Sequence, residues 1–127
     1  MTERGFTLLE VLLALLVVAV GLTALVQSAT RSLNDTTAIR ERTFATWIGS
    51  NVITEYQVTD QWSRGETSED RDFAGRTWPV SIRVSAPAND LLRNRVRRIE
   101  VTVYAPHNPE QSLRVVRGRL LRPEDSR

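Results

Sequence analysis

Residues 6–26 read FTLLEVLLALLVVAVGLTALV, a run of 21 residues in which Glu10 is the one charged side chain. As a helix this run would span roughly 31 Å, about the thickness of the hydrocarbon core of a bilayer. A secretory signal peptide fits the run poorly, because its apolar part is only about 7–15 residues long and leads to a cleavage site of small residues. Residues 24–32 instead continue as a good helix-forming sequence. The run therefore predicts a helix that stays in the membrane.

The charges around this run indicate its orientation. Arg4 precedes it, and the next basic residue is Arg31. Basic residues close to a transmembrane helix favour the cytoplasmic side. We therefore expect a single-pass membrane protein with a cytoplasmic N-terminus and the C-terminal domain on the far side, in the periplasm if the cell is Gram-negative.

Glu10 is the exceptional residue of the run. A carboxylate near the membrane core costs about 2.5–3.5 kcal/mol on insertion scales, so its presence needs an explanation. One interpretation is that Glu10 lies close enough to the helix end to reach the lipid headgroups. The other is that a cation of another subunit pairs with it, and a free amine on Phe6, exposed by cleavage after Gly5, is the obvious candidate.

The stretch 5–11, GFTLLEV, resembles the type IV prepilin motif, which has Gly, an aromatic residue or Met, a small hydroxyl residue, two aliphatic residues and Glu. The resemblance implies that residues 1–5 are a leader, that a membrane prepilin peptidase cuts between Gly5 and Phe6, and that the same enzyme methylates the new amine of Phe6. It also implies that Glu10 aligns subunits in a helical fibre.

Residues 27–57 predict an amphipathic continuation of the same helix, with no Gly or Pro before Gly49. At 100° per residue most apolar side chains fall within about half of the circumference, whereas Ile39 and Ile53 do not fit. The side chains of this stripe are Ala29, Leu33, Phe44, Ala45, Trp47, Ile48, Val52 and Tyr56. We expect one helix over residues 6–57, of which 6–26 cross the membrane and 27–57 pack on a sheet.

Trp47 has two interpretations, as a core residue or as a contact with the helix of a neighbouring subunit. A small sheet and half a helix bury too little area to cover every large apolar group of the stripe. The predicted contacts with a partner helix are therefore Phe44, Trp47, Ile48 and Val52. Asn51 and Glu55, four residues apart on one face, would bond each other, a local surface network or a partner.

Residues 58–127 predict a loop followed by an antiparallel sheet of about four strands. The loop covers 58–68, and the strands cover 70–74, 77–85, 96–105 and 112–121. Gly75-Arg76 predicts a type II′ hairpin, Pro79 an edge strand or a strand start, residues 107–110 a turn, and Gly118 a bulge. One long helix on such a sheet is an α+β architecture.

The residue types that most often carry out catalysis or bind metals are scarce in this sequence. Cysteine is absent, and the one histidine, His107, falls in a predicted turn. Glu66, Glu69, Asp70 and Asp72 lack the spacing of a compact calcium loop, so we interpret them as a solvated loop. We expect no enzyme activity, no metal and no cofactor.

The stretch 41–55 resembles a segment of the I-type minor pseudopilins of type II secretion systems, E-[K/R]-T-x-A-x-W-x-x-x-N-x-x-x-E, and the stretches 73–76 and 97–103 are similar to their strands. Val80 departs from the pattern, since an aromatic residue is usual there. The resemblance implies a pilin-like fold. It also implies that J-type and K-type minor pseudopilins are partners, with which this chain forms and primes the tip of the pseudopilus.

The alternative is a minor pilin of a type IV pilus or a DNA-uptake apparatus. Residues 76–127 carry a net charge of +6, which suits either nucleic acid or an acidic protein. This part offers only Trp78 and Tyr104 for base stacking, and a cysteine-free chain cannot form the disulfide loop of many type IV pilins. We therefore expect no nucleic acid as a partner.

Overall fold

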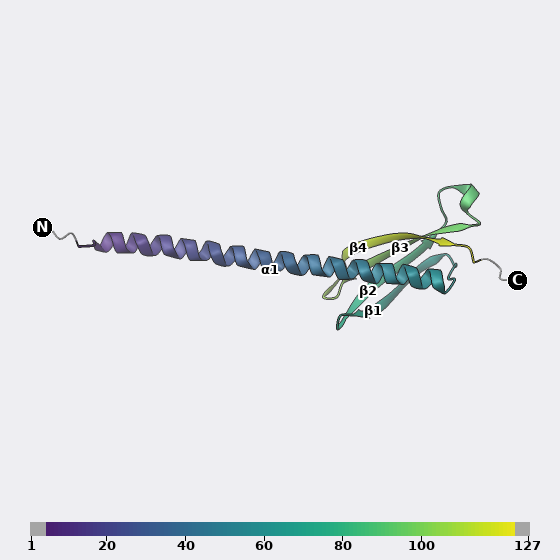
Figure 1. Cartoon of the computed structure of the whole chain (residues 1–127), viewed down its shortest axis with the longest axis horizontal. Coiled ribbons are helices and arrows are strands. Elements are labelled where there is room, and N and C mark those ends of the chain that lie inside the picture. The colour runs from purple at the N-terminus through teal and green to yellow at the C-terminus, as the bar shows by residue number, and fades with distance from the viewer. Residues whose placement is uncertain (1–4, 124–127) are drawn as a thin grey trace. The chain divides into compact units, whose positions relative to one another are not determined.

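The computed structural model describes residues 5–123 of the chain. The chain forms two compact units, the first ending at Ala38 and the second beginning at Ile39. Helix α1 (Leu8–Val58) supplies the helical structure of both (Figure 1). Most of the predicted leader, residues 1–4, and the last residues, 124–127, lie outside the described residues.

The first unit is helical from Leu8 onward, and each of its described residues is exposed. The helix continues through the apolar run and beyond it, as the sequence predicts. Threonine hydroxyls along the helix donate hydrogen bonds to the backbone carbonyl four residues earlier. Thr23 donates to Ala19 and Thr30 donates to Val26, both at 2.9 Å. A hydroxyl that bonds its own helix in this way needs no water, so it is compatible with an apolar surrounding.

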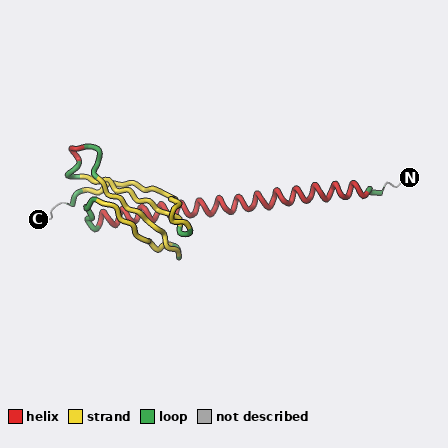
Figure 2. The backbone as a smooth tube through the Cα atoms, turned by 180° about the vertical axis from the view of Figure 1, so that it is seen from behind, coloured by secondary structure: helices red, strands yellow, loops and turns green. Residues whose placement is uncertain are grey.

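The second unit consists of the later part of α1 and one antiparallel sheet with the strand order β1-β2-β3-β4. The strands are β1 (Gly65–Phe73), β2 (Arg76–Ser85), β3 (Val96–Ala105) and β4 (Asn108–Leu121), with a short 3-10 helix, η1 (Asp90–Leu92), before β3. Figure 2 shows the strands as one layer beside the helix. The predicted α+β fold, a long helix packed on a four-stranded antiparallel sheet, is confirmed.

The core lies between α1 and one face of this sheet. Along β2, Trp78, Val80, Ile82 and Val84 are at most 5% exposed and alternate with side chains of the other face. Strand β3 repeats the pattern, as the sequence predicts, since strands that bury one face alternate apolar and polar residues. The helix, β3 and β4 complete the core with Ala45, Ile48, Val52, Ile53, Ile99, Val101, Val103, Ala105 and Leu120.

The first hairpin differs from its prediction. Strand β1 begins at Gly65, so the predicted loop over 58–68 is too long by four residues, and the acidic residues from Glu66 on belong to a strand. Phe73 pairs with Arg76, which makes Ala74-Gly75 the two turn residues. Their φ angles are +51° and +73°. Positive φ at both central positions is the geometry of a type I′ turn, whose twist matches that of the strands, so the predicted type II′ turn at Gly75-Arg76 is wrong.

The second half of the sheet also corrects the sequence prediction. Strand β4 begins at Asn108 and pairs it with Ala105, so the turn is residues 106–107 and shares only His107 with the predicted 107–110. The pairing between β3 and β4 shifts on either side of Tyr104, whereas Gly118 pairs regularly with Ile99. Strand β2 begins at Arg76 and is internal, so Pro79, its fourth residue, is neither at a strand start nor in an edge strand. The pairing of β2 with β3 begins at Val80, the residue after it.

Two glycines allow the helix to approach the sheet closely. A Cβ atom on Gly118 would lie 2.9 Å from Cγ2 of Ile53, and one on Gly49 would lie 2.6 Å from Cγ2 of Val116. Both distances are below van der Waals contact, so neither position tolerates a side chain without rearrangement. This contact explains why Ile53, which does not fit the predicted stripe, is only 8% exposed.

Candidate functional site

The junction between Gly5 and Phe6 lies directly before the first turn of α1. Phe6 is 84% exposed. A Cβ atom on Gly5 would have no heavy atom of the described residues within 4 Å beyond its chain neighbours, so none of residues 5–123 covers the backbone here. Both residues predicted to flank the cleavage site are thus accessible in the isolated chain.

Thr7 caps the helix. Its hydroxyl oxygen accepts a hydrogen bond from the backbone N–H of Glu10 at 3.2 Å, and its carbonyl accepts one from Val11 at 3.2 Å. Thr7 and Glu10 have the spacing of a capping box, in which the first hydroxyl satisfies one of the unpaired N–H groups of the first turn. A cap at Thr7 was not among the sequence predictions, although the T-x-x-E spacing of residues 7–10 indicates it.

Glu10 is the acidic residue of the first helical turn. A carboxylate at this end interacts favourably with the partial positive charge of the helix N-terminus. Among residues 5–123 no cation lies within ion-pair distance of it. The helix around it is long and apolar enough to cross a membrane: a stretch of 18 residues has a mean hydropathy of 2.7 and none of it is buried.

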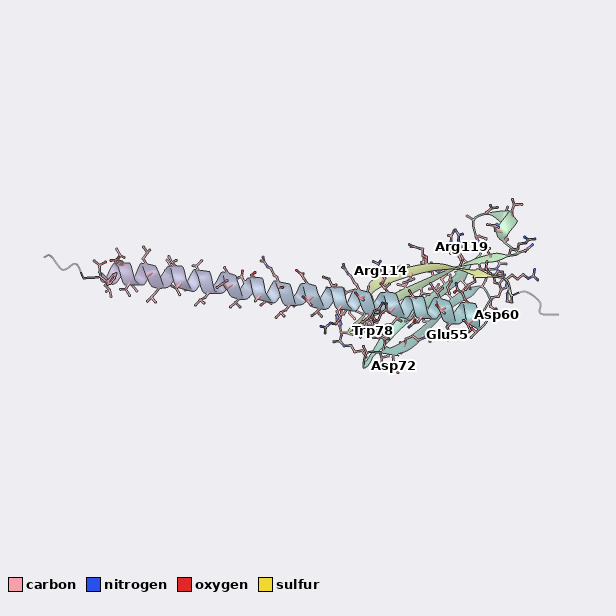
Figure 3. All side chains as sticks on the ribbon, viewed as in Figure 1. Glu55, Asp60, Asp72, Trp78, Arg114 and Arg119 are labelled. Carbon is pink, nitrogen blue, oxygen red and sulfur yellow. The ribbon has the colours of Figure 1, made fainter. Side chains whose placement is uncertain are left out.

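An aromatic cluster of Phe44, Trp47, Phe73 and Trp78 joins α1 to the first hairpin in the second unit. The centroid of the Phe44 ring lies 5.4 Å from that of Phe73, 6.1 Å from Trp47 and 6.3 Å from Trp78. Trp78 is fully buried and its indole N–H donates to the carbonyl of Phe73 at 3.0 Å. Trp47 lies at the outside of the cluster and is 55% exposed. Figure 3 labels Trp78, the fully buried member of the cluster.

The structure divides the four residues predicted to contact a partner helix. Ile48 and Val52 are 3% and 1% exposed and belong to the core of this domain. Phe44 is partly buried against that core, and Trp47 is exposed. Trp47 is therefore not the core residue of the first interpretation. The contact with a partner helix stays a prediction, and Trp47 with Phe44 is the part of the set that a partner could reach.

Ion pairs hold the helix to the hairpin on both sides of Trp47. Glu41 accepts a hydrogen bond from Arg76 at 3.2 Å, and Nδ1 of His107 lies 3.8 Å from the same carboxylate. Farther along the helix, Arg71 of β1 donates to Glu55 at 2.7 Å and pairs with Glu69 as well.

The Glu55 ion pair affects both of its groups. The hydrogen bond from Arg71 lowers the pKa of Glu55 below its ordinary value, and the same bond raises the pKa of Arg71. Glu55 thus bonds its own sheet, and Asn51 is exposed one turn before it. The surface-network interpretation of Glu55 holds, with Arg71 as the partner.

The sequence profile of the family described as "Type II secretion system (T2SS), protein I" matches residues 39–120, which is well over half of the chain. This chain belongs to the type II secretion system protein I family. The match begins at the residue where the second unit begins. A second profile, the prokaryotic N-terminal methylation motif, matches residues 1–26 and so covers the predicted cleavage site and the apolar run.

Several curated proteins named type II secretion system protein I are similar to this family member. The one from Dickeya chrysanthemi is 34% identical over 125 residues, which cover 97% of this chain and 96% of that protein. The one from Pseudomonas aeruginosa is 35% identical over 91 residues, covering 71% and 70% of the two chains. The one from Escherichia coli is 35% identical over 92 residues, covering 72% and 75%.

These matches confirm the I-type resemblance of the stretch 41–55 and do not favour the alternative of a type IV pilus or DNA-uptake subunit. Members of this family are structural pseudopilin components of the secretion system. The departure at Val80 leaves this membership intact. Val80 is 2% exposed and fills the sheet core, where a smaller apolar residue replaces the aromatic one.

Proposed function

We propose that this chain, a minor pseudopilin of the type II secretion system, forms and primes the tip of the pseudopilus together with J-type and K-type minor pseudopilins. The role is structural: the chain supplies a membrane helix and a small domain that pack beside those of its siblings. The observation that carries the proposal is the helix of the first unit, whose apolar side chains are exposed without exception among its described residues.

The first step of the proposal is maturation at the inner membrane. The prepilin peptidase cuts between Gly5 and Phe6 on the cytoplasmic side, removing residues 1–5, and methylates the amine of Phe6. The methylation motif over residues 1–26 and the open backbone at Gly5 support this step. Residues 6–26 remain in the lipid of the inner membrane, and the domain from Ile39 on lies in the periplasm.

The second step is alignment of the helices through Glu10. Its carboxylate has no cation among residues 5–123, and a carboxylate in the membrane is costly unless it is paired. The amine of Phe6 on a neighbouring subunit supplies the opposite charge at the same membrane depth. A pair of this kind fixes the register of two helices that apolar contacts alone would allow to slide.

The third step is contact between periplasmic domains through Trp47 and Phe44. Exposed tryptophan is enriched at the centre of protein interfaces, because it buries a large area at a low cost in side-chain entropy. The ion pairs of Glu41 and Glu55 with the sheet hold this part of α1 in place. A rigid helix that presents one aromatic side chain suits the side of a neighbouring helix.

The proposal is tested by co-purifying the full chain with its J-type and K-type siblings from membranes, comparing Glu10→Gln with the native sequence. We expect Glu10→Gln to be cleaved after Gly5, as N-terminal peptide mass shows, and to recover the siblings at most at roughly one tenth of the native yield, since a loss of about 1.4 kcal/mol in binding is tenfold. Asp35→Asn, which removes an exposed carboxylate of the same unit outside the apolar run 6–26, is the control and should recover them normally.

Two results would contradict the proposal. Normal recovery of the siblings with Glu10→Gln would contradict the proposed pairing of Glu10 with the amine of Phe6. A mature chain that still carries residues 1–5 in cells with active peptidase would remove the maturation step.

A further inference from the structure

Two arginines lie directly opposite each other at one end of the sheet. Arg98 of β3 pairs with Arg119 of β4. Their neighbours Ile99 and Leu120 are buried against α1, so both arginine side chains project from the other face of the sheet, and both are exposed. Like charges in directly opposite positions of neighbouring strands destabilise a sheet.

The neighbouring arginines of this face are neutralised, but this pair is not. Arg117 donates to Glu100 at 2.8 Å, and Arg83 lies 3.4 Å from Glu66. Within residues 5–123 no carboxylate pairs with Arg98 or Arg119. The acidic residues that the structure describes therefore leave two adjacent positive charges uncompensated.

A groove of about 440 Å³ lies beside the pair, between the segment that carries η1 and the strands β3 and β4. The sheet contributes Arg98, Arg117, Arg119 and the apolar Val96 to its lining, and the segment before β3 contributes the apolar residues Pro87 and Leu92. Local bonds shape the η1 segment: Asn89 accepts from the backbone N–H of Leu91 at 3.0 Å, and Arg93 pairs with Asp90 at 2.8 Å. The groove thus combines cationic side chains with apolar ones.

We propose that this arginine groove, lined by Arg98, Arg117, Arg119, Leu92 and Val96, binds an acidic segment of a partner protein. Carboxylates of the segment pair with Arg98 and Arg119 and remove the repulsion between them. A planar guanidinium accepts a carboxylate through two parallel hydrogen bonds, which suits the arginines of this groove. An apolar side chain of the same segment lies against Leu92 and Val96.

The surroundings of the groove favour a polypeptide over nucleic acid. Among the residues that the structure describes, no aromatic side chain lines the groove, so the groove offers no platform on which a base would stack. The Glu100 carboxylate stays beside Arg117, and the same face carries further carboxylates on β1, such as Glu66. A backbone of phosphates would be repelled by these groups, whereas a short segment with a few carboxylates needs only the end of the sheet.

The location also disfavours a lipid headgroup. The chain enters the second unit at Ile39, whereas the carbonyl of Arg119 accepts a hydrogen bond from Gln57 at 3.1 Å, close to the end of α1. The helix from Ile39 to Gln57 is roughly 27 Å long. The arginine pair is thus near the end of this unit that is far from the entering chain.

The groove is separate from the aromatic cluster around Trp47. Arg98 pairs with Ser85, which lies seven residues after Trp78 on β2, or roughly 23 Å along the strand. Trp78 faces the helix and Arg98 faces away from it. Figure 3 shows Arg119 and Trp78 in separate parts of this unit. A second partner could therefore bind here while a sibling helix contacts Trp47.

The experiment measures binding of a fluorescein-labelled peptide of Glu, Ser and Leu residues to the full chain in phosphatidylcholine nanodiscs, by fluorescence anisotropy at physiological salt. We expect the double variant Arg98→Gln/Arg119→Gln to bind this peptide at least roughly tenfold more weakly, because charge-assisted hydrogen bonds are stronger than neutral ones. The matched control is Arg40→Gln/Arg42→Gln, which removes the same charge from α1 and should change the affinity less than twofold.

Thermal unfolding of both double variants separates binding from folding. Arg98→Gln/Arg119→Gln should unfold at or above the temperature of the native chain, because it relieves a repulsion. Equal loss of affinity in the two double variants, or no measurable binding by the native chain, would overturn the proposal. So would tighter binding of duplex DNA, or displacement of the peptide by phosphatidylglycerol vesicles, if either depends on Arg98 and Arg119.

Discussion

The two units differ in whether they bury their apolar residues. The first unit holds the most apolar stretch of the sequence, yet none of its described residues is buried. The second unit is richer in charge and still encloses a core in which Trp78, Ile99, Val101 and Val103 are fully buried. The first unit thus presents its apolar side chains to its surroundings, whereas the second encloses a core of its own and leaves a few large apolar side chains, such as Trp47, exposed. This difference is expected of a subunit that carries a folded domain on an assembly helix.

The largest expected effect tests whether the core of the second unit is self-sufficient. Trp78→Ala should lower the free energy of unfolding by about 4 kcal/mol, because it empties a fully buried site and removes the hydrogen bond to Phe73. Trp47→Ala, the matched change at an exposed position, should lower it by less than about 1 kcal/mol. Calorimetry of the full chain in nanodiscs measures both. Equal losses would mean that Trp47 belongs to the core after all.

The second-largest expected effect on stability comes from comparing Gly49 with Gly21, two glycines of α1. Gly49→Ala should destabilise the second unit by about 2 kcal/mol, because the new methyl group overlaps Val116. Gly21→Ala meets no heavy atom within 4 Å, and alanine is the better helix former, so the second unit should keep its stability. The same calorimetry decides between them. If Gly21→Ala destabilised the second unit, the two units would not be independent.

The smallest effect concerns the ion pair between α1 and β1. Arg71 lowers the pKa of Glu55, so the stabilisation is present at neutral pH and is lost as the pH falls below the ordinary value of 4.5 and through the lowered one. Arg71→Gln should therefore cost ~0.5 kcal/mol at pH 7, the size typical of an exposed pair, and nothing in strong acid. Urea unfolding at several pH values measures this difference. A difference that does not change with pH would assign the effect to packing of the Arg71 side chain instead.

Much of the site and the fold could be predicted because the signals are local. The apolar run and the motif over residues 5–11 each need only neighbouring residues, and so does the alternation along β2 and β3. The capping role of Thr7 belongs to the same class, since its T-x-x-E spacing is visible in the sequence. These features depend on the periods of helix and strand and on residue type alone.

Other features were decided by the tertiary structure. The burial of Ile53 depends on Gly118, which lies 65 positions later in the chain and makes room for it. The type I′ turn at Ala74-Gly75 and the shift beside Tyr104 follow from the register of whole strands, which no short window specifies. The exposure of Trp47 has the same origin: the helical stripe is apolar over about half its circumference, but the sheet covers only the part that faces it. The sequence by itself determined that this chain has a membrane helix and an α+β domain, and strand pairing and close packing decided which aromatic residue remains free for a partner.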